Sequence, residues 1–121
     1  MFKDTKAFSG FSVNDLEAAK AFYGGTLGLD IGEANGMLQL KVAGGNPILV
    51  YPKSDHVPAE YTMLNFPVAD IEGTVRELTG RGVSFERYND DQDDSGIYRG
   101  IGPLIAWFKD PAGNVIAIIQ E

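Results

Sequence analysis

Residues 13–17 read Val-Asn-Asp-Leu-Glu, and residues 68–72, which lie 55 positions later, read Val-Ala-Asp-Ile-Glu. A second pair lies nearer the ends of the two halves. Residues 45–50 read Gly-Asn-Pro-Ile-Leu-Val, and residues 113–118, 68 positions later, read Gly-Asn-Val-Ile-Ala-Ile. Because both pairs occur in the same order, the simplest interpretation is a duplicated module. The larger second offset means that the second half contains additional residues between its helix and its last strand.

The first module reads as a strand, a helix and three further strands. Asn14 or Asp15 caps the helix, with Glu17 in a capping-box position. A helical stripe follows at Leu16, Ala19 and Tyr23. The predicted end of the helix is a set of glycines: Gly24, Gly25 and Gly28. The predicted strands cover residues 8–13, 29–34, 37–43 and 47–51, and Asn35-Gly36 predicts a tight hairpin within them.

The second module repeats this order. Asp70 caps a helix that carries Ile71, Val75 and Leu78 and that ends at Gly80 and Gly82. The predicted strands are residues 63–68, 84–88, 104–109 and 115–119, and an additional Asp- and Gly-rich loop covers residues 89–103. We therefore expect 121 residues to form a single α+β domain, with module one at about residues 6–51, a linker at 52–60, and module two at about 61–120.

Composition excludes several classes of function. Ten basic and seventeen acidic residues give a net charge of −7, which argues against nucleic acid and against an anionic membrane surface. The chain has no cysteine, so it has no disulfide, thiolate nucleophile or cysteine metal ligand. No apolar run approaches the length of a membrane span and no signal-peptide pattern opens the sequence, so we expect a cytoplasmic protein.

Familiar catalytic motifs are missing. The only histidine, His56, lies in the linker, and we expect it to be a solvated surface residue because no Gly-x-Ser-x-Gly motif accompanies it. The acidic stretch 90–96 resembles a calcium loop, but its twelfth position, counted from Asp91, is Gly102 instead of glutamate. We therefore expect a solvated, mobile loop. A carboxylate site for Mg²⁺ or Mn²⁺ stays open.

The duplicated pattern resembles the vicinal oxygen chelate superfamily of glyoxalase I, bleomycin-resistance proteins and extradiol dioxygenases. The resemblance rests on residues 13–17, on Ala21-Phe22-Tyr23, on Leu27-Gly28-Leu29, and on the closing stretch Trp107-Phe108-Lys109-Asp110-Pro111-Ala112-Gly113-Asn114. It covers residues from about Lys6 to Gln120. The fold that it implies is two tandem βαβββ modules whose mixed sheets curl into a half-open barrel with the helices outside.

The resemblance also implies where a metal would be held, at one position in the first and last strand of each module. Those positions are Phe8, Leu49, Met63 and Ala117, none of which offers an oxygen or imidazole ligand. We therefore expect no metal and no cofactor, and an apolar cavity in their place. Such a cavity suits a small molecule.

Strand alternation indicates which other residues would line this cavity. If Phe8 and Met63 face inward, so do Gly10, Ser12 and Asn65. Tyr88, Tyr98 and Trp107 are candidates to stack on a planar ligand, with ordinary core or dimer packing as the alternative. Arg99 is a candidate to bind a ligand carboxylate. The alternative for Arg99 is a surface ion pair with Asp93 or Asp94.

Three functions stay open at this point. The first is a metal-free small-molecule-binding protein similar to bleomycin-resistance proteins, whose ligand grooves lie between the subunits of a homodimer. The second is a glyoxalase-like lyase or isomerase with relocated carboxylate ligands, for which the candidates are Glu86, Asp90 and Glu121. The third is an interaction module whose cavity is filled by its own side chains. The expected partners are a small-molecule ligand and a second copy of the chain.

Overall fold

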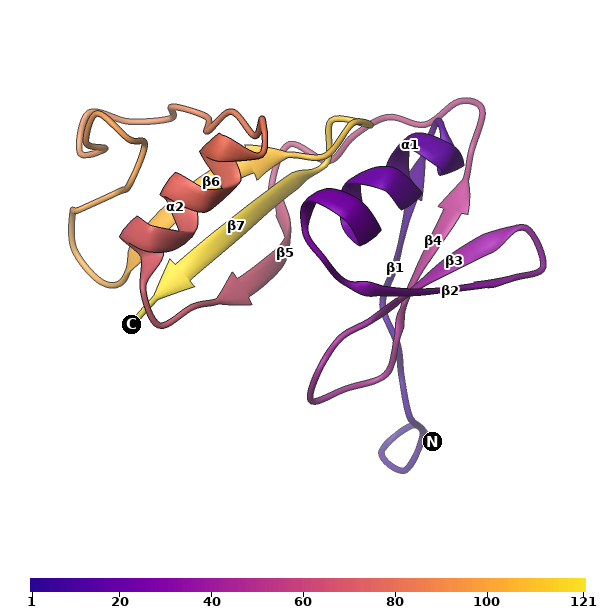
Figure 1. Ribbon diagram of the computed structural model, residues 1–121. Coiled ribbons are helices and arrows are strands. Elements are labelled where there is room, and N and C mark those ends of the chain that lie inside the picture. Colours follow the sequence, from indigo (N-terminus) through magenta and orange to yellow (C-terminus); the bar gives the residue numbers. More distant parts are fainter. The chain divides into compact units, whose positions relative to one another are not determined.

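The structure, a computed structural model, describes residues 1–121 and divides into two compact units, Met1–Val57 (unit 1) and Pro58–Glu121 (unit 2) (Figure 1). The boundary falls inside the predicted linker, residues 52–60. Each unit combines helix with a mixed sheet, so the predicted α+β class is confirmed. The helical segments are far too short to span a bilayer.

Unit 1 contains β1 (Gly10–Val13), α1 (Leu16–Lys20), the π-helical segment η1 (Ala21–Thr26), β2 (Asp30–Ala34), β3 (Met37–Lys41) and β4 (Ile48–Pro52). The strand order is β1-β4-β3-β2, in which β1 is parallel to β4 and the other neighbours are antiparallel. The buried core of the unit lies between the helical segment and one face of this sheet. Its members are apolar or aromatic: Val13, Ala19, Tyr23, Leu38, Leu40, Ile48 and Val50.

The helical segment of unit 1 begins as predicted but ends differently. Asp15 is the N-cap, and its carboxylate accepts a hydrogen bond from the Ala18 N–H at 3.1 Å. Gly24 and Gly25 do not end the helix, because the chain passes through both in the wider π-helical turn of η1. Gly28, which has a φ of +74°, turns the chain away instead. Tyr23 is the buried residue of this segment, and its ring packs against Phe11 and Phe22.

The predicted Asn-Gly hairpin is confirmed. Asn35 and Gly36 have φ values of +56° and +74°, and they join β2 to β3 between the paired residues Ala34 and Met37. Positive φ at both central residues is the type I′ geometry that matches the twist of the flanking strands. All five residues of β2 therefore pair with β3.

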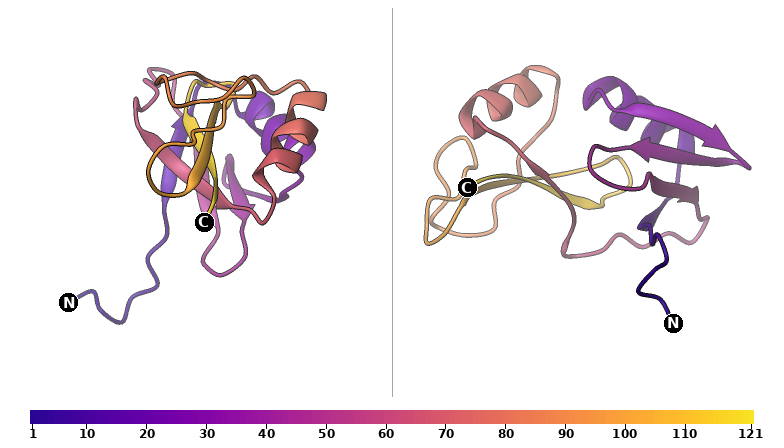
Figure 2. Two further views of the ribbon diagram at one scale, coloured as in Figure 1. Left: turned by 90° about the vertical axis from the view of Figure 1, so that its left-hand side faces the viewer. Right: turned by 90° about the horizontal axis from the view of Figure 1, so that it is seen from below.

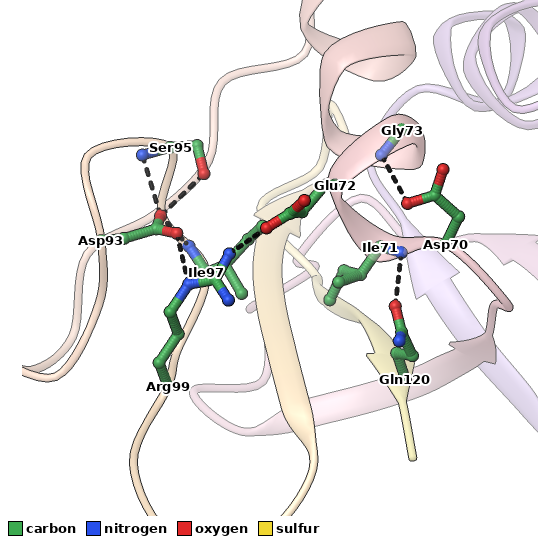
Figure 3. Close-up of polar contacts among 9 residues, drawn as sticks. All are labelled: Asp70, Ile71, Glu72, Gly73, Asp93, Ser95, Ile97, Arg99 and Gln120. Atoms are coloured by element: carbon green, nitrogen blue, oxygen red, sulfur yellow. Dashed lines mark hydrogen bonds and ion pairs between the residues drawn. The ribbon is translucent and has the colours of Figure 1, made fainter.

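Unit 2 contains β5 (Thr62–Pro67), α2 (Ile71–Gly80), β6 (Leu104–Lys109) and β7 (Val115–Gln120). The order is β5-β7-β6, with β5 parallel and β6 antiparallel to β7. Both views of Figure 2 show α2 covering one face of this sheet, where it contacts β6 and β7. Asp70 caps α2 by accepting a hydrogen bond from Gly73 N–H, and the Gln120 side chain accepts another from Ile71 N–H (Figure 3).

The prediction of a strand at residues 84–88 is wrong. Only one isolated bridge, between Phe85 and Phe108, joins this segment to β6. The cause is a side chain that occupies the backbone groups a strand would use. Gln92 donates to the Glu86 carbonyl oxygen at 2.9 Å and accepts from Tyr88 N–H at 2.6 Å. The additional loop, through Gln92, therefore prevents residues after Phe85 from continuing as a strand beside β6.

The two sheets pair in the same register, as the duplication predicts. Gly10 lies opposite Leu49 in unit 1, and Asn65 lies opposite Ala117 in unit 2. These pairs are related by the same offsets, 55 and 68 positions, that relate the repeated sequence motifs. The strands of the two repeats are thus structurally equivalent.

Candidate functional site

Strand register identifies the residues on the face of each sheet that points away from its helix, which we call the helix-distal face. In unit 1 the neighbouring strands place Gly10, Leu49 and Gln39 in one row across β1, β4 and β3. The alternate residues Leu38, Leu40 and Val50 are fully buried toward the helical segment. Since side chains alternate along a strand, Leu49 and Gln39 lie on the helix-distal face.

A hollow of about 240 Å³ lies at this row of unit 1. It is lined by Lys6, Phe8, Gln39, Asn46, Pro47 and Leu49. Phe8, although apolar, has an exposed fraction of 66%. The Asn46 amide donates to the carbonyl oxygens of Lys6 and Ala7 at 3.0 and 2.9 Å, so the segment before β1 is tied to the hollow's rim. The predicted Phe8 and Leu49 are thus brought together, and Lys6, Gln39 and Asn46 join them.

Unit 2 carries an aromatic group at the equivalent place. Its row is Asn65, Ala117 and Trp107, across β5, β7 and β6. The Trp107 ring lies edge-on to Tyr88, with centroids 5.5 Å apart, and to Tyr98, with centroids 6.2 Å apart. Burial, followed by the charge of the Glu86 carboxylate, raises the pKa of the Tyr88 phenol, so the phenol stays neutral at ordinary pH. Three predicted residues therefore form one aromatic group.

The other predicted residues of unit 2 differ in exposure. Ala117 is fully buried, Met63 is half-buried and Asn65 is exposed. The register shifts between Thr62 and Leu64, so Met63 is the additional residue of a β-bulge. The simple alternation used to predict the direction of Met63 does not hold across a bulge.

The four positions at which the family resemblance places metal ligands do not fit a metal ion. Phe8, Leu49, Met63 and Ala117 lack an oxygen or imidazole donor. Nor do three His, Cys, Asp or Glu side chains gather anywhere in the chain. Of the relocated ligands considered, the Glu86 carboxylate is paired with the Lys109 ammonium at 3.2 Å.

Arg99 makes the surface ion pair that was the alternative to ligand binding. Its Nε donates to the Asp93 carboxylate at 2.8 Å, and its Nη2 donates to Glu72 of α2 at 2.5 Å (Figure 3). The guanidinium is therefore engaged by two carboxylates, and it fastens the additional loop to the helix.

The loop itself is more ordered than a solvated loop. Ile97 is buried, and the buried Gln92 amide bonds to four backbone groups, those of Glu86, Tyr88, Asn89 and Gly96. The Asp93 carboxylate accepts hydrogen bonds from Ser95, Ile97 and Arg99 (Figure 3). Desolvation raises the pKa of Asp93, but these hydrogen bonds together outweigh it and hold the pKa well below its usual range. The carboxylate thus organises its own loop, and the expectation of a solvated, mobile loop is wrong.

A contact that sequence reasoning missed involves His56. The imidazole is half-buried, and its Nδ1 lies 2.6 Å from the Ser12 hydroxyl oxygen. Ser12 precedes the buried Val13 in β1 and therefore lies on the helix-distal face with Gly10. His56 is therefore not the fully solvated residue that the sequence predicts. No short motif predicts the contact, because 44 positions separate Ser12 and His56.

A larger hollow, of about 540 Å³, lies in unit 2 beside α2. It is lined by α2 residues such as Arg76 and Thr79 and by loop residues such as Asp94 and Gly96. None of the predicted ligand-binding residues lines it.

Comparisons with known proteins agree with this fold. Residues 8–118 match the family model of the Glyoxalase/Bleomycin resistance protein/Dioxygenase superfamily, and the chain belongs to that superfamily. No protein of curated function matched the sequence.

Solved structures similar to the chain include proteins of different described roles. A glyoxalase family protein from Enterococcus faecalis has a TM-score of 0.72 at 22% identity, with 98% of this chain and 99% of that chain covered. TnmS3, an antibiotic binding protein from Streptomyces sp. CB03234, has a TM-score of 0.69 at 25% identity, with 97% of each chain covered. The fosfomycin resistance protein FosX from Listeria monocytogenes has a TM-score of 0.72 at 13% identity, with 95% of this chain and 91% of that chain covered.

Proposed function

We propose that this protein binds a small organic molecule without a metal ion, in the manner of the antibiotic-binding and resistance members of its superfamily. The observation that carries the proposal is the replacement of all four family ligand positions by Phe8, Leu49, Met63 and Ala117. The similarity to TnmS3, described as an antibiotic binding protein, supports it. An apolar face with a few polar groups is what such ligands require.

The ligand that we propose is planar and largely apolar. Trp107 with its two tyrosines offers aromatic surface, and aromatic rings gain from stacked or edge-on contacts with a second ring. In unit 1, the Gln39 amide and the Lys6 ammonium border the apolar surface of Phe8 and Leu49. These two groups would orient a carbonyl or hydroxyl group of a molecule bound at the hollow of unit 1, which is a separate candidate from the aromatic group of unit 2.

Trp107 is the only tryptophan, so its fluorescence reports on the proposed site directly. We expect a saturable change in this fluorescence when planar aromatic antibiotics are titrated into the protein. Met63→Arg should abolish the change at a modest cost in stability. Thr79→Arg, which adds the same charge on the exposed surface of α2, should leave the titration unchanged.

Two results would count against this site. A titration that Met63→Arg leaves intact would mean that the ligand does not contact Met63. Loss of folding in Met63→Arg, together with no response in the wild-type protein, would favour a face filled by its own side chains.

Elemental analysis of protein purified without chelator tests the metal-free part of the proposal. We expect far less than one transition-metal or Mg²⁺ ion per chain. A value near one ion per chain would favour a metal-dependent lyase or isomerase instead.

We further propose that the protein is cytoplasmic and that it forms a homodimer, as its resemblance to the bleomycin-resistance branch implies. Light scattering should then give about twice the chain mass of 13.1 kDa. A mass of one chain at micromolar concentration would contradict the dimer but not the ligand site.

A further inference from the structure

We propose that Ser12 and His56 form a nucleophile and general base that accept an acyl group from an activated ester. The carrying observation is the 2.6 Å distance between the Ser12 hydroxyl oxygen and His56 Nδ1. This is the reach that a general base needs to remove the proton of an attacking hydroxyl. The proposed activity goes beyond ligand binding and does not require it.

The backbone holds both residues in place. Ser12 lies within β1, where the Ser9 and Val13 carbonyl oxygens accept hydrogen bonds from Leu49 and Lys53 N–H. Lys53 begins the turn that carries the histidine, and His56 N–H donates back to the Lys53 carbonyl oxygen at 3.1 Å. The Lys53 ammonium is also paired with the Asp55 carboxylate at 2.7 Å. Both residues are therefore carried by hydrogen-bonded backbone.

The pair is only partly covered by the rest of the chain. Both Ser12 and His56 are half-buried, so each keeps some contact with solvent. Ser12 shares its face of the sheet with Gly10, beside the row that contains Leu49. Gly10 itself contributes no side chain to that face.

In the proposed reaction Ser12 is first acylated by the ester and is then released by water. In the tautomer with its proton on Nε2, His56 Nδ1 accepts the Ser12 proton while the hydroxyl oxygen attacks the ester carbonyl carbon. The carbon–oxygen bond to the alcohol breaks, and the imidazolium returns its proton to the departing alkoxide. Water then attacks the acyl-serine with the same imidazole as base, which releases a carboxylic acid and restores the hydroxyl.

Labelling with a fluorophosphonate tests the nucleophile in the wild-type protein. We expect close to one label per chain, located on Ser12 by peptide mass spectrometry. With p-nitrophenyl acetate we expect a rapid release of about one nitrophenolate per chain. Label on another residue, or no label at all, would overturn the proposal.

Variants separate chemistry from structure. Ser12→Ala should remove the labelling, and His56→Gln should slow it by about 100-fold or more, in line with the contribution of a general base. Ser9→Ala, an exposed serine on the same segment, should label at the wild-type rate. Equal labelling rates in His56→Gln and the wild-type protein, with both folded by circular dichroism, would reduce the pair to a structural hydrogen bond.

Discussion

The two units share a register but not a surface chemistry. The row Gly10, Leu49 and Gln39 of unit 1 has its equivalent in Asn65, Ala117 and Trp107 of unit 2. The first row borders a hollow with an amide and an ammonium group, and the second presents an aromatic group. The backbone pairing is thus common to both repeats, whereas the side chains of the helix-distal faces have diverged.

The largest expected effect comes from substitutions in the two buried cores, which test whether the cores of unit 1 and unit 2 are equivalent. Ile116 is fully buried, and its counterpart Ile48, which lies 68 positions earlier, is almost as buried. Ile116→Ala should lower the free energy of unfolding by about 3 kcal/mol, because it leaves a cavity in the core. Ile48→Ala should lower it by a similar but smaller amount. Urea denaturation measures both, and a loss below about 1 kcal/mol for either would break the equivalence.

The second prediction compares two glutamines. Gln92 in unit 2 is buried with its amide fully hydrogen-bonded, whereas Gln39 in unit 1 is half-buried at the hollow. Gln92→Ala should lower the free energy of unfolding by about 2 kcal/mol, because it leaves buried backbone groups without partners. Gln39→Ala should change it by less than about 0.5 kcal/mol. If chemical denaturation gave similar losses of unfolding free energy for the two variants, the Gln92 amide would not be what holds the loop of unit 2.

The third prediction concerns the two-residue Asn35-Gly36 hairpin of unit 1, whose equivalent place in unit 2 is taken by the additional loop. Gly36→Ala should destabilise the protein by about 1 kcal/mol, because the residue has a φ of +74°. Gly25→Ala lies in helical backbone with open space around it and should be neutral or slightly stabilising. Thermal unfolding of the two variants tests the contrast, which a gain in Tm for Gly36→Ala would contradict.

The smallest effect is a pH dependence expected from the loop of unit 2. The pKa of Asp93 is lowered in the folded protein, so the stabilisation that its ionised form contributes is complete above the unfolded pKa of about 3.9. That stabilisation is lost as the pH falls from this value toward the folded pKa. Asp93→Asn should therefore lose less stability than the wild-type protein between pH 5 and pH 2, measured by Tm.

Asp94→Asn provides the matched control, since it removes the same charge from the neighbouring residue. It should keep the wild-type pH dependence, because its carboxylate makes none of the hydrogen bonds that hold Asp93. Identical profiles for all three proteins would contradict the role assigned to Asp93.

Most of the fold follows from local patterns in the sequence. Asp15, Asp70 and the Asn35-Gly36 turn act through neighbours within a few positions, so their structures could be predicted. The duplication likewise predicted the pairing of equivalent strands. Local signals of this kind are the strongest that a sequence carries.

The failures have long-range or side-chain causes. The segment 84–88 has strand-like residues, but the Gln92 amide takes its backbone groups. Periodicity does not show a β-bulge, and so the direction of Met63 was not predictable. The Ser12–His56 contact joins residues 44 positions apart. Arg99 forms ion pairs with two carboxylates, one of which, Glu72, lies on α2. Only the folded chain brings such partners together.

The double hydrogen bond from Asn46 has a practical consequence for anyone who prepares this protein. It holds the backbone of Lys6 and Ala7, so whatever precedes them emerges next to the hollow of unit 1. A purification tag fused ahead of Met1 would be held near that opening. It would compete with added compounds for the hollow. Preparations intended for ligand screening should therefore have any tag removed from this end of the chain.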